Sequence, residues 1–216
     1  MIAVDHLTVR VGGFALEDVG FDVAPGQYAV LMGRTGAGKT TLLEALCGLK
    51  AVAGGTIRLN GRDVTRLKPA ERGIGYVPQD RALFQTMTVR EHLAFALIIQ
   101  KANRDVIQRR IAELSRLLGI EGLLDRKPHG LSGGEAQRVA LGRALSAQAG
   151  ILCLDEPLTA LDDETRREMY ALLMNVQQST GVTILHVTHN LEEAEQLADS
   201  IFLLRNGKVE RLEVTT

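Results

Sequence analysis

The sequence YAVLMGRTGAGKTT at residues 28–41 decides the fold of this chain. Its first five residues are typical of a short buried strand, and residues 33–40 form a glycine-rich loop. After the loop, Leu42, Ala45 and Leu46 recur at helical spacing. A strand, a glycine-rich loop and a helix in this order are the context that a phosphate-binding loop requires. We therefore predict that this segment binds the phosphate groups of a nucleotide.

The residue types in this loop each have a chemical reason to be there. Glycines let backbone N–H groups point at phosphate oxygens, and the N-terminus of the following helix adds partial positive charge. Lys39 supplies a full positive charge for the β- and γ-phosphates, and Thr40 offers a hydroxyl to Mg²⁺. The alternative is a chance match in a glycine-rich turn, which the strand–loop–helix context makes less favourable.

A second candidate element is the acidic pair Asp155–Glu156, which follows four apolar residues at 151–154. Such a run is typical of a strand buried on both faces. In α/β sheets ligands bind at the carboxyl ends of strands, so the pair is expected to face the same crevice as the loop. We predict that Asp155 holds Mg²⁺ and that Glu156 polarises a water aimed at the γ-phosphate. Taken alone, an Asp–Glu pair is more often a solvated helix start.

A third candidate element is the segment Leu131-Ser132-Gly133-Gly134-Glu135, at the start of a predicted helix. Ser-x-x-Glu is a capping box, which is its structural explanation. Two glycines in a first helical turn, however, cost about 1 kcal/mol each relative to alanine. They make sense where backbone approaches a ligand, with Ser132 and the helix N-terminus facing phosphate. One nucleotide needs only one such cradle, so a second indicates a nucleotide clamped between two chains.

The apolar pattern predicts an α/β fold in a single domain of residues 1–216. Residues 1–31 contain short β-type stretches separated by glycine and proline. Residues 86–147 are helical in pattern and predict an inserted helical lobe. Strand and helix then alternate again, which implies a parallel sheet covered by helices. We therefore expect residues 1–85 and 148–216 to form a nucleotide-binding core.

Composition narrows the class of partner. The chain has 25 Lys and Arg against 26 Asp and Glu, a net charge of −1, whereas nucleic-acid binders usually carry a strong positive excess. The longest apolar run, residues 93–99, is far shorter than the ~20 residues that span a bilayer. No secretory signal is visible at the N-terminus. Any membrane role is therefore expected to come through a partner, and Cys47 and Cys153 are expected to be small core residues.

The chain resembles the ATP-binding subunits of ABC transporters. The resemblance covers essentially the whole chain, and its most specific element is the segment 131–135. It implies a P-loop NTPase (RecA-like) core with a parallel sheet, an N-terminal antiparallel β region and an inserted helical lobe. It also implies a head-to-tail dimer with two ATP molecules at the interface. Each ATP then lies between the phosphate loop of one chain and Ser132 to Glu135 of the other.

The resemblance also implies roles for single residues. Gln79 reaches Mg²⁺ and the attacking water and senses the partner, Asp162 lies at the dimer seam, and His189 contacts the γ-phosphate. From the sequence alone, these three read as a surface glutamine, a helix cap and a hydrogen-bonded core histidine. The implied catalytic residues are Glu156, His189 and Gln79, and the implied Mg²⁺ ligands are Thr40, Gln79 and Asp155. The implied ATP contacts are Gly33, Arg34, Thr35, Gly36, Ala37, Gly38, Lys39, Thr40 and Thr41, with Ser132, Gly133, Gly134, Glu135 and Asp162.

The chain departs from the family pattern at the adenine site. The family usually places an aromatic residue just before a glycine near the start of the chain, where it stacks on the base. Here that position holds Val11, before Gly12, and Phe14 is the candidate substitute. Glu135 and Thr159 stand where glutamine and serine are commoner, and neither change is expected to abolish function.

The resemblance implies an ATP-hydrolysing motor subunit of a bacterial importer, which drives a separate membrane permease. The permease is expected to dock near residues 79–95, with Leu83, Phe84 and Met87 as candidate contacts, although these residues also fit an ordinary lobe core. We expect a homodimer or a pair with a homologous ATPase subunit, no nucleic-acid partner, and no further regulatory domain after Val209. The expected location is cytoplasmic and peripheral on the inner face of the membrane. The alternative is a soluble or envelope-associated ABC-type ATPase with no role in solute transport.

Overall fold

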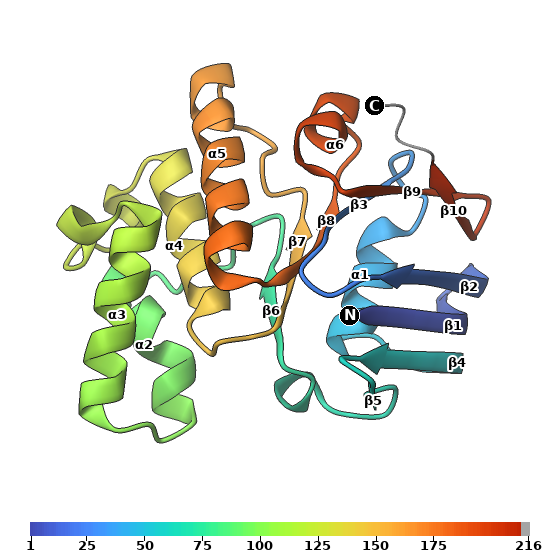
Figure 1. The fold of residues 1–216 in the computed structure, drawn as a ribbon, viewed down its shortest axis with the longest axis horizontal. Helices are drawn as coiled ribbons and strands as arrows, with labels where there is room; N and C mark the ends of the chain where they lie inside the picture. The colour runs from blue at the N-terminus through green and yellow to red at the C-terminus, as the bar shows by residue number, and fades with distance from the viewer. Residues whose placement is uncertain (213–216) are drawn as a thin grey trace.

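The computed structural model describes residues 1–212 and contains two β-sheets (Figure 1). The larger sheet consists of β3 (Tyr28–Met32), β6 (Ile74–Val77), β7 (Ile151–Asp155), β8 (Thr183–Val187), β9 (Ser200–Arg205) and β10 (Lys208–Leu212). Its strand order is β10-β9-β3-β8-β7-β6. All neighbours from β9 to β6 are parallel, and β10 is antiparallel to β9. The predicted parallel sheet is therefore confirmed.

The smaller sheet is antiparallel. Its strands are β1 (Ile2–Val11), β2 (Phe14–Val23), β4 (Val52–Leu59) and β5 (Arg62–Asp63), in the order β2-β1-β4-β5. Strand β1 is central, since Ile2 lies opposite both Val23 of β2 and Leu59 of β4. The predicted antiparallel β region at the N-terminus is confirmed, and its third strand comes from beyond the phosphate loop.

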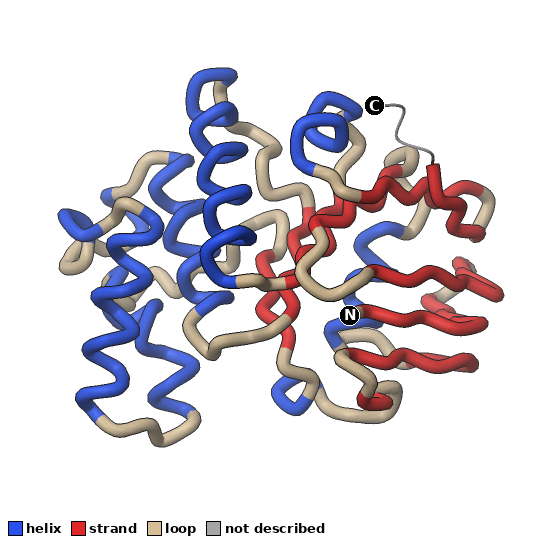
Figure 2. The backbone as a smooth tube through the Cα atoms, in the orientation of Figure 1, coloured by secondary structure: helices blue, strands red, loops and turns tan. Residues whose placement is uncertain are grey.

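Six α-helices lie within residues 1–212, together with short 3-10 turns at 69–71, 121–123 and 128–130. The helices are α1 (Lys39–Cys47), α2 (Val89–Ile99), α3 (Arg104–Leu118), α4 (Gly133–Leu145), α5 (Asp163–Thr180) and α6 (Leu191–Leu197). Helices α2, α3 and α4 gather at the end of the molecule away from the smaller sheet (Figure 2). A Cβ on Gly142 of α4 would lie 2.5 Å from the Leu93 side chain of α2 and 2.8 Å from the Leu118 side chain of α3, so a larger residue here would force these leucines to move.

The central strands are buried on both faces, which explains their continuous apolar runs. Val30 and Leu154 pack in a cluster that they share with α4, α5 and α6. Their chain neighbours Leu31 and Cys153 face the other side and pack with α1 and the smaller sheet. Helix α1 therefore lies between the two sheets, and both of its faces are covered.

Parallel pairing brings the chemically distinctive residues to one edge of the larger sheet. Strands β3, β6, β7 and β8 run in the same direction, so their carboxyl ends meet there. The phosphate loop follows β3, Gln79 follows β6, Asp155 ends β7 and His189 follows β8. Over residues 1–212, no helix has both the length and the apolar character needed to cross a membrane. Cys47 and Cys153 are buried and free, as expected of small core residues.

Candidate nucleotide-binding site

The glycines of residues 33–38 are required by the backbone path between β3 and α1. Gly36 and Gly38 have φ angles of 80° and 100°, which side chains other than hydrogen rarely allow. A Cβ on Gly33 would lie 2.7 Å from the carbonyl oxygen of Leu204 in the adjacent β9. The loop therefore follows a path that only glycine permits, and α1 begins directly after it, at Lys39.

The ammonium group of Lys39 is held within this loop. Its Nζ donates to the carbonyl oxygens of Gly33 at 2.9 Å and Arg34 at 3.3 Å. Lys39 is only 5% exposed, although it is a charged residue in the first turn of a helix. Nζ also lies 3.9 Å from Oε1 of Glu156, which comes from the end of β7. The structure thus brings a buried cation from the loop next to the acidic pair.

Thr40 and Asp155 meet from opposite sides of the crevice. The Thr40 hydroxyl donates to Oδ1 of Asp155 at 3.2 Å. Asp155 is 2% exposed, and burial raises the pKa of its carboxyl group, while the hydrogen bond from Thr40 acts in the opposite direction. A hydroxyl and a carboxylate side by side form an oxygen donor set that fits a hard divalent cation such as Mg²⁺.

Glu156 points away from its chain neighbour because its backbone is left-handed. Its φ is 44°, and its N–H donates to the carbonyl oxygen of Val187 in β8 at 2.9 Å. Its carboxylate lies 3.3 Å from Nδ1 of His189 and accepts a hydrogen bond from the hydroxyl of Thr159 at 3.2 Å. Glu156, Lys39 and His189 therefore converge, although they come from three different strand ends. The contact of Thr159 was missed by sequence reasoning, because the residue stood out only as a departure from the family pattern.

Gln79 lies in an exposed turn after β6. The turn is closed by a hydrogen bond from the N–H of Arg81 to the carbonyl oxygen of Pro78 at 2.9 Å. Of the candidate docking residues, Leu83 is half-buried and packs against the core, whereas Phe84 is 42% exposed. The Phe84 ring stacks on His92 with 5.8 Å between ring centroids.

The segment 131–135 forms the predicted capping box. Oγ of Ser132 accepts from the N–H of Glu135 at 3.2 Å, and the Glu135 carboxylate accepts from the N–H of Ser132 at 2.7 Å. A Cβ on Gly134 would lie 2.6 Å from Thr165 of α5, so packing within the chain accounts for this glycine. A Cβ on Gly133 would meet nothing closer than 3.6 Å. Of the two glycines, packing within residues 1–212 therefore requires Gly134 but not Gly133.

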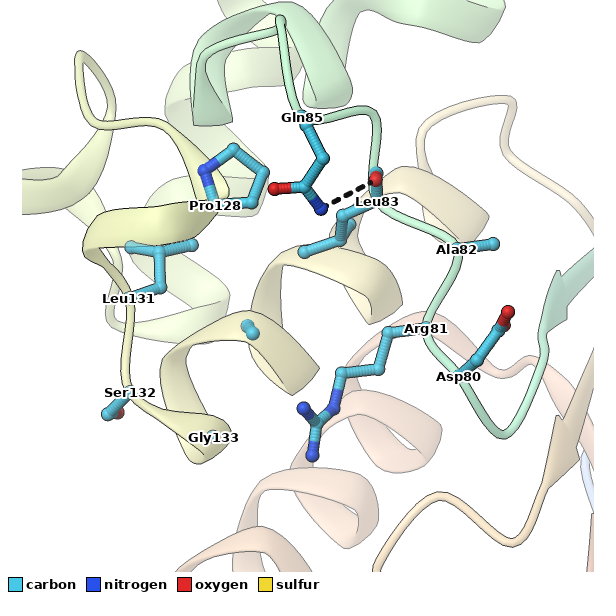
Figure 3. Close-up of a pocket in the computed structure, with 10 residues that line it drawn as sticks. Asp80, Arg81, Ala82, Leu83, Gln85, Pro128, Leu131, Ser132 and Gly133 are labelled. Carbon is cyan, nitrogen blue, oxygen red and sulfur yellow. Dashed lines mark hydrogen bonds between the residues drawn. The ribbon is translucent and has the colours of Figure 1, made fainter.

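The phosphate loop and Ser132 line different cavities. A cavity of about 620 Å³ is lined by Phe14, residues 34–37 and the β9–β10 turn. A second cavity of about 380 Å³ lies between residues 80–85 and the start of α4, where it includes Ser132 and Gly133 (Figure 3). The two predicted phosphate cradles therefore do not form one pocket in a single chain.

The remaining candidate residues are Phe14, Val11 and Asp162. Phe14 lies against the loop, since a Cβ on Gly38 would be 2.6 Å from its ring. Val11 lies opposite Phe14 in the β1–β2 pairing and is exposed. Asp162 is exposed and caps α5, where its carboxylate accepts from the N–H of Thr165 at 2.9 Å. His186, three residues before His189, is fully buried and lies 3.0 Å from the hydroxyl of Tyr28, as expected of a structural histidine.

Comparison with known proteins identifies the family. The ABC transporter family profile matches residues 16–159. The chain is 45% identical to the molybdate/tungstate import ATP-binding protein WtpC of Thermococcus kodakarensis, over 97% of this chain and 63% of that protein. It is 43% identical to the sulfate/thiosulfate import ATP-binding protein CysA of Thermosynechococcus vestitus, over 98% of this chain and 63% of that protein.

The chain thus spans less than two thirds of the length of either relative. A solved dimeric ATP-binding cassette, in a post-hydrolysis state with ADP and Pi, aligns over 100% of both chains with a TM-score of 0.85 and 27% identity. The family match covers more than half of the chain and includes the phosphate loop, the segment 131–135 and the acidic pair. The chain belongs to the ABC transporter family.

Proposed function

We propose that this chain is the ATP-hydrolysing subunit of an importer, which dimerises around two ATP molecules and drives a separate membrane permease. The observation that carries this proposal is the convergence of Lys39, Glu156 and His189 beside the Thr40–Asp155 pair. A buried cation, a carboxylate and an oxygen donor set are the groups needed to bind a triphosphate and position an attacking water. The relatives named as import ATP-binding proteins support the assignment to import.

In this proposal the loop residues bind the triphosphate. Backbone N–H groups of residues 33–41 contact the phosphate oxygens, and the ammonium of Lys39 exchanges its carbonyl partners for the β- and γ-phosphates. Thr40 and Asp155, with Gln79, would hold Mg²⁺. Bound Mg²⁺ neutralises charge on the phosphate oxygens. Phe14 packs against the base, because its ring already lies against the loop. Val11, which lies opposite Phe14 in the β1–β2 pairing, makes a smaller contact with the base.

Glu156 acts as the general base in this proposal. Its carboxylate accepts a hydrogen bond from Thr159 and lies near the Lys39 ammonium, so its orientation is fixed before water arrives. His189, 3.3 Å from Glu156 and 54% exposed, contacts the γ-phosphate from the side of β8. In these positions, Glu156 activates the water while His189 orients the γ-phosphoryl group.

The second half of each site comes from a partner chain. Ser132, Gly133 and the N-terminus of α4 face the γ-phosphate bound to the loop of the other copy, and Asp162 lies beside them at the seam. Gly133 leaves its backbone open to the phosphate because a Cβ there would meet no atom closer than 3.6 Å among residues 1–212. Gly134 and Glu135 hold the first turn in place. ATP therefore joins two surfaces, and hydrolysis separates them again.

The permease docks near residues 79–95, with Phe84 as the exposed contact, and holds the subunit at the inner face of the membrane. Relatives of similar identity carry names with different cargoes, so this chain by itself does not select the solute. Molybdate, tungstate and sulfate share a tetrahedral oxyanion form. We propose this class as the solute to test first, by uptake in cells that contain or lack the chain.

The Glu156→Gln variant tests the hydrolytic role. It should retain ATP binding, because the phosphate loop is unchanged, and turnover should fall by about 10²-fold or more because the base is lost. Size-exclusion chromatography with Mg²⁺ and ATP should show a stable dimer. Near-normal hydrolysis by this variant would remove Glu156 from its role. A variant that stays monomeric with saturating ATP, even beside its permease, would contradict the dimer proposal as a whole.

A further inference from the structure

We infer that Arg143 of α4 is a positioning residue, which holds the turn after Gln79 against the helix that begins at Gly133. The guanidinium of Arg143 donates to the carbonyl oxygens of both Arg81 (3.0 Å) and Ala82. It also lies 5.7 Å from the centroid of the Phe84 ring. This inference rests on the proposed function, since it assigns a role in ATP turnover to a residue that touches no nucleotide.

The turn that Arg143 holds has a backbone that needs support. Arg81 and Ala82 have φ angles of 63° and 45°, and both carry a Cβ, so their left-handed conformations are unfavourable in isolation. Such conformations persist only where the surroundings fix them. The two carbonyl oxygens that accept from Arg143 belong to these same two residues. A planar guanidinium suits two neighbouring acceptors, whereas an ammonium group is a point donor.

A second contact ties the same turn to the start of α4. Nε of Arg81 donates to Oε1 of Gln137 at 3.1 Å, and Gln137 is buried one turn after Gly133. The Arg81 guanidinium reaches toward Gly133 across the cavity, where a Cβ added to Gly133 would lie 3.8 Å from Nη2 of Arg81 (Figure 3). The turn therefore touches α4 near both of its ends, through Arg81 at the start and Arg143 at the other end.

The strand that leads into this turn also contacts α4 directly. A Cβ on Gly75 of β6 would lie 2.3 Å from the carbonyl oxygen of Ala144, next to Arg143. Strand β6 and the C-terminal part of α4 are thus in direct contact, without space for a side chain at Gly75. A displacement of the turn would then be transmitted to α4, and so to Ser132 at its start, through the contacts of Arg81, Arg143 and Gly75. Arg143 is the side chain that keeps the turn fixed relative to α4, so that the two move together.

The Arg143→Lys variant tests the inference by hydrogen exchange and by kinetics. A lysine reaches only one of the two carbonyl oxygens at a time, so the turn should open more often. Exchange of the Arg81 and Phe84 amides, which donate to Pro78 and to His92, should become about ten-fold faster in the purified chain. The kcat for ATP should fall about ten-fold, while KM stays within about two-fold, because the phosphate loop is untouched.

The matched control is Arg138→Lys on the same helix. Arg138 donates to the carbonyl oxygen of Leu118 and to Glu168, and makes no hydrogen bond to the turn. It should leave the exchange of Arg81 and Phe84 and the kcat unchanged. Equal effects of the two substitutions would overturn the inference, as would an Arg143→Lys chain that exchanges and hydrolyses like the unmodified one.

Two further outcomes separate this inference from the proposed function. Faster exchange with an unchanged kcat would overturn the positioning role while leaving ATP hydrolysis intact. If the unmodified chain hydrolyses no ATP, the proposed function fails, and with it the catalytic part of the inference. The exchange measurements, which need no nucleotide, then still decide whether Arg143 holds the turn. Melting curves of each variant ensure that only folded protein is compared.

Discussion

Asp155 and Glu156 are neighbours in the chain but have opposite surroundings. Asp155 ends a strand that is buried on both faces, and burial raises the pKa of its carboxyl group. Glu156, with a left-handed backbone, turns its carboxylate toward Lys39 and His189. Because of the positive φ at Glu156, its carboxylate faces the crevice, whereas that of Asp155 is buried and suited to a cation. The buried charge is unfavourable for folding, which leads to a prediction.

Asp155→Asn should make the free protein more stable at pH 7. A carboxyl group whose pKa is raised by folding binds its proton more tightly in the folded state, so its ionised form lowers stability at neutral pH. Removing the charge should raise the Tm by about 2–4 °C, which corresponds to about 1 kcal/mol for a chain of this size. An asparagine still accepts the hydrogen bond from Thr40.

Two further measurements test the role of the Asp155 charge. The gain in Tm should shrink as the pH is lowered toward 4, because Asp155 itself then becomes protonated. The variant should also lose the additional stabilisation that Mg²⁺ with ATP gives to the unmodified chain. A lower Tm at pH 7 than that of the unmodified chain would contradict the account of Asp155.

Helices α2 and α4 begin with the same device. Thr88 and Ser132 each accept from the N–H of a glutamate three residues later at 3.2 Å, and each glutamate accepts in return at 2.6 Å and 2.7 Å. Local geometry therefore gives the two caps the same stabilising role. Only the cap of α4 is proposed to face a nucleotide, so the pair provides an internal control.

Thr88→Ala and Ser132→Ala should destabilise the chain equally, by about 1 kcal/mol each, as measured by urea denaturation. In a Glu156→Gln background, only Ser132→Ala should weaken ATP-dependent dimerisation, because its hydroxyl is proposed to contact the partner's γ-phosphate. If both variants dimerise alike, Ser132 is a helix cap and nothing more.

At the scale of the whole molecule, the two phosphate cradles line separate cavities of about 620 Å³ and about 380 Å³. In the proposed dimer, a single chain would offer half of each of two sites. A two-fold arrangement of copies would complete both sites at once, because each surface of one chain would meet the complementary surface of the other. The proposed dimer follows from this division of the site between two surfaces.

Mixing two inactive variants should restore ATP hydrolysis. Lys39→Ala disables the phosphate loop and Ser132→Arg blocks the opposing surface, so neither homodimer has an intact site. A mixed dimer has one intact site, formed by the loop of the Ser132→Arg chain and the α4 start of the Lys39→Ala chain. With equal mixing and equal sites, half of the dimers are mixed and each has one intact site of two, so about a quarter of the activity of the unmodified chain should return. Activity that stays absent on mixing, while chromatography shows mixed dimers, would exclude a site shared in this way.

Sequence reasoning by itself determined the local features of this protein. The glycine loop between a strand and a helix, the cap at Ser132 and the buried run before Asp155 were all predicted and are present. The helical pattern of residues 86–147 corresponds to α2, α3 and α4. These features depend on residues within about four positions of each other, so hydrophobic periodicity and capping patterns in the sequence are enough to predict them.

The tertiary structure alone decided which distant residues meet. The sheet order places β9 beside β3, and the left-handed Glu156 brings its carboxylate to Lys39, 117 residues earlier in the chain. The link from Arg143 to Arg81 and the contact of Gly134 with Thr165 likewise left no trace in local sequence. Long-range pairing depends on packing over the whole core, where many contacts of small individual energy act together. A single sequence carries no local signal of such contacts.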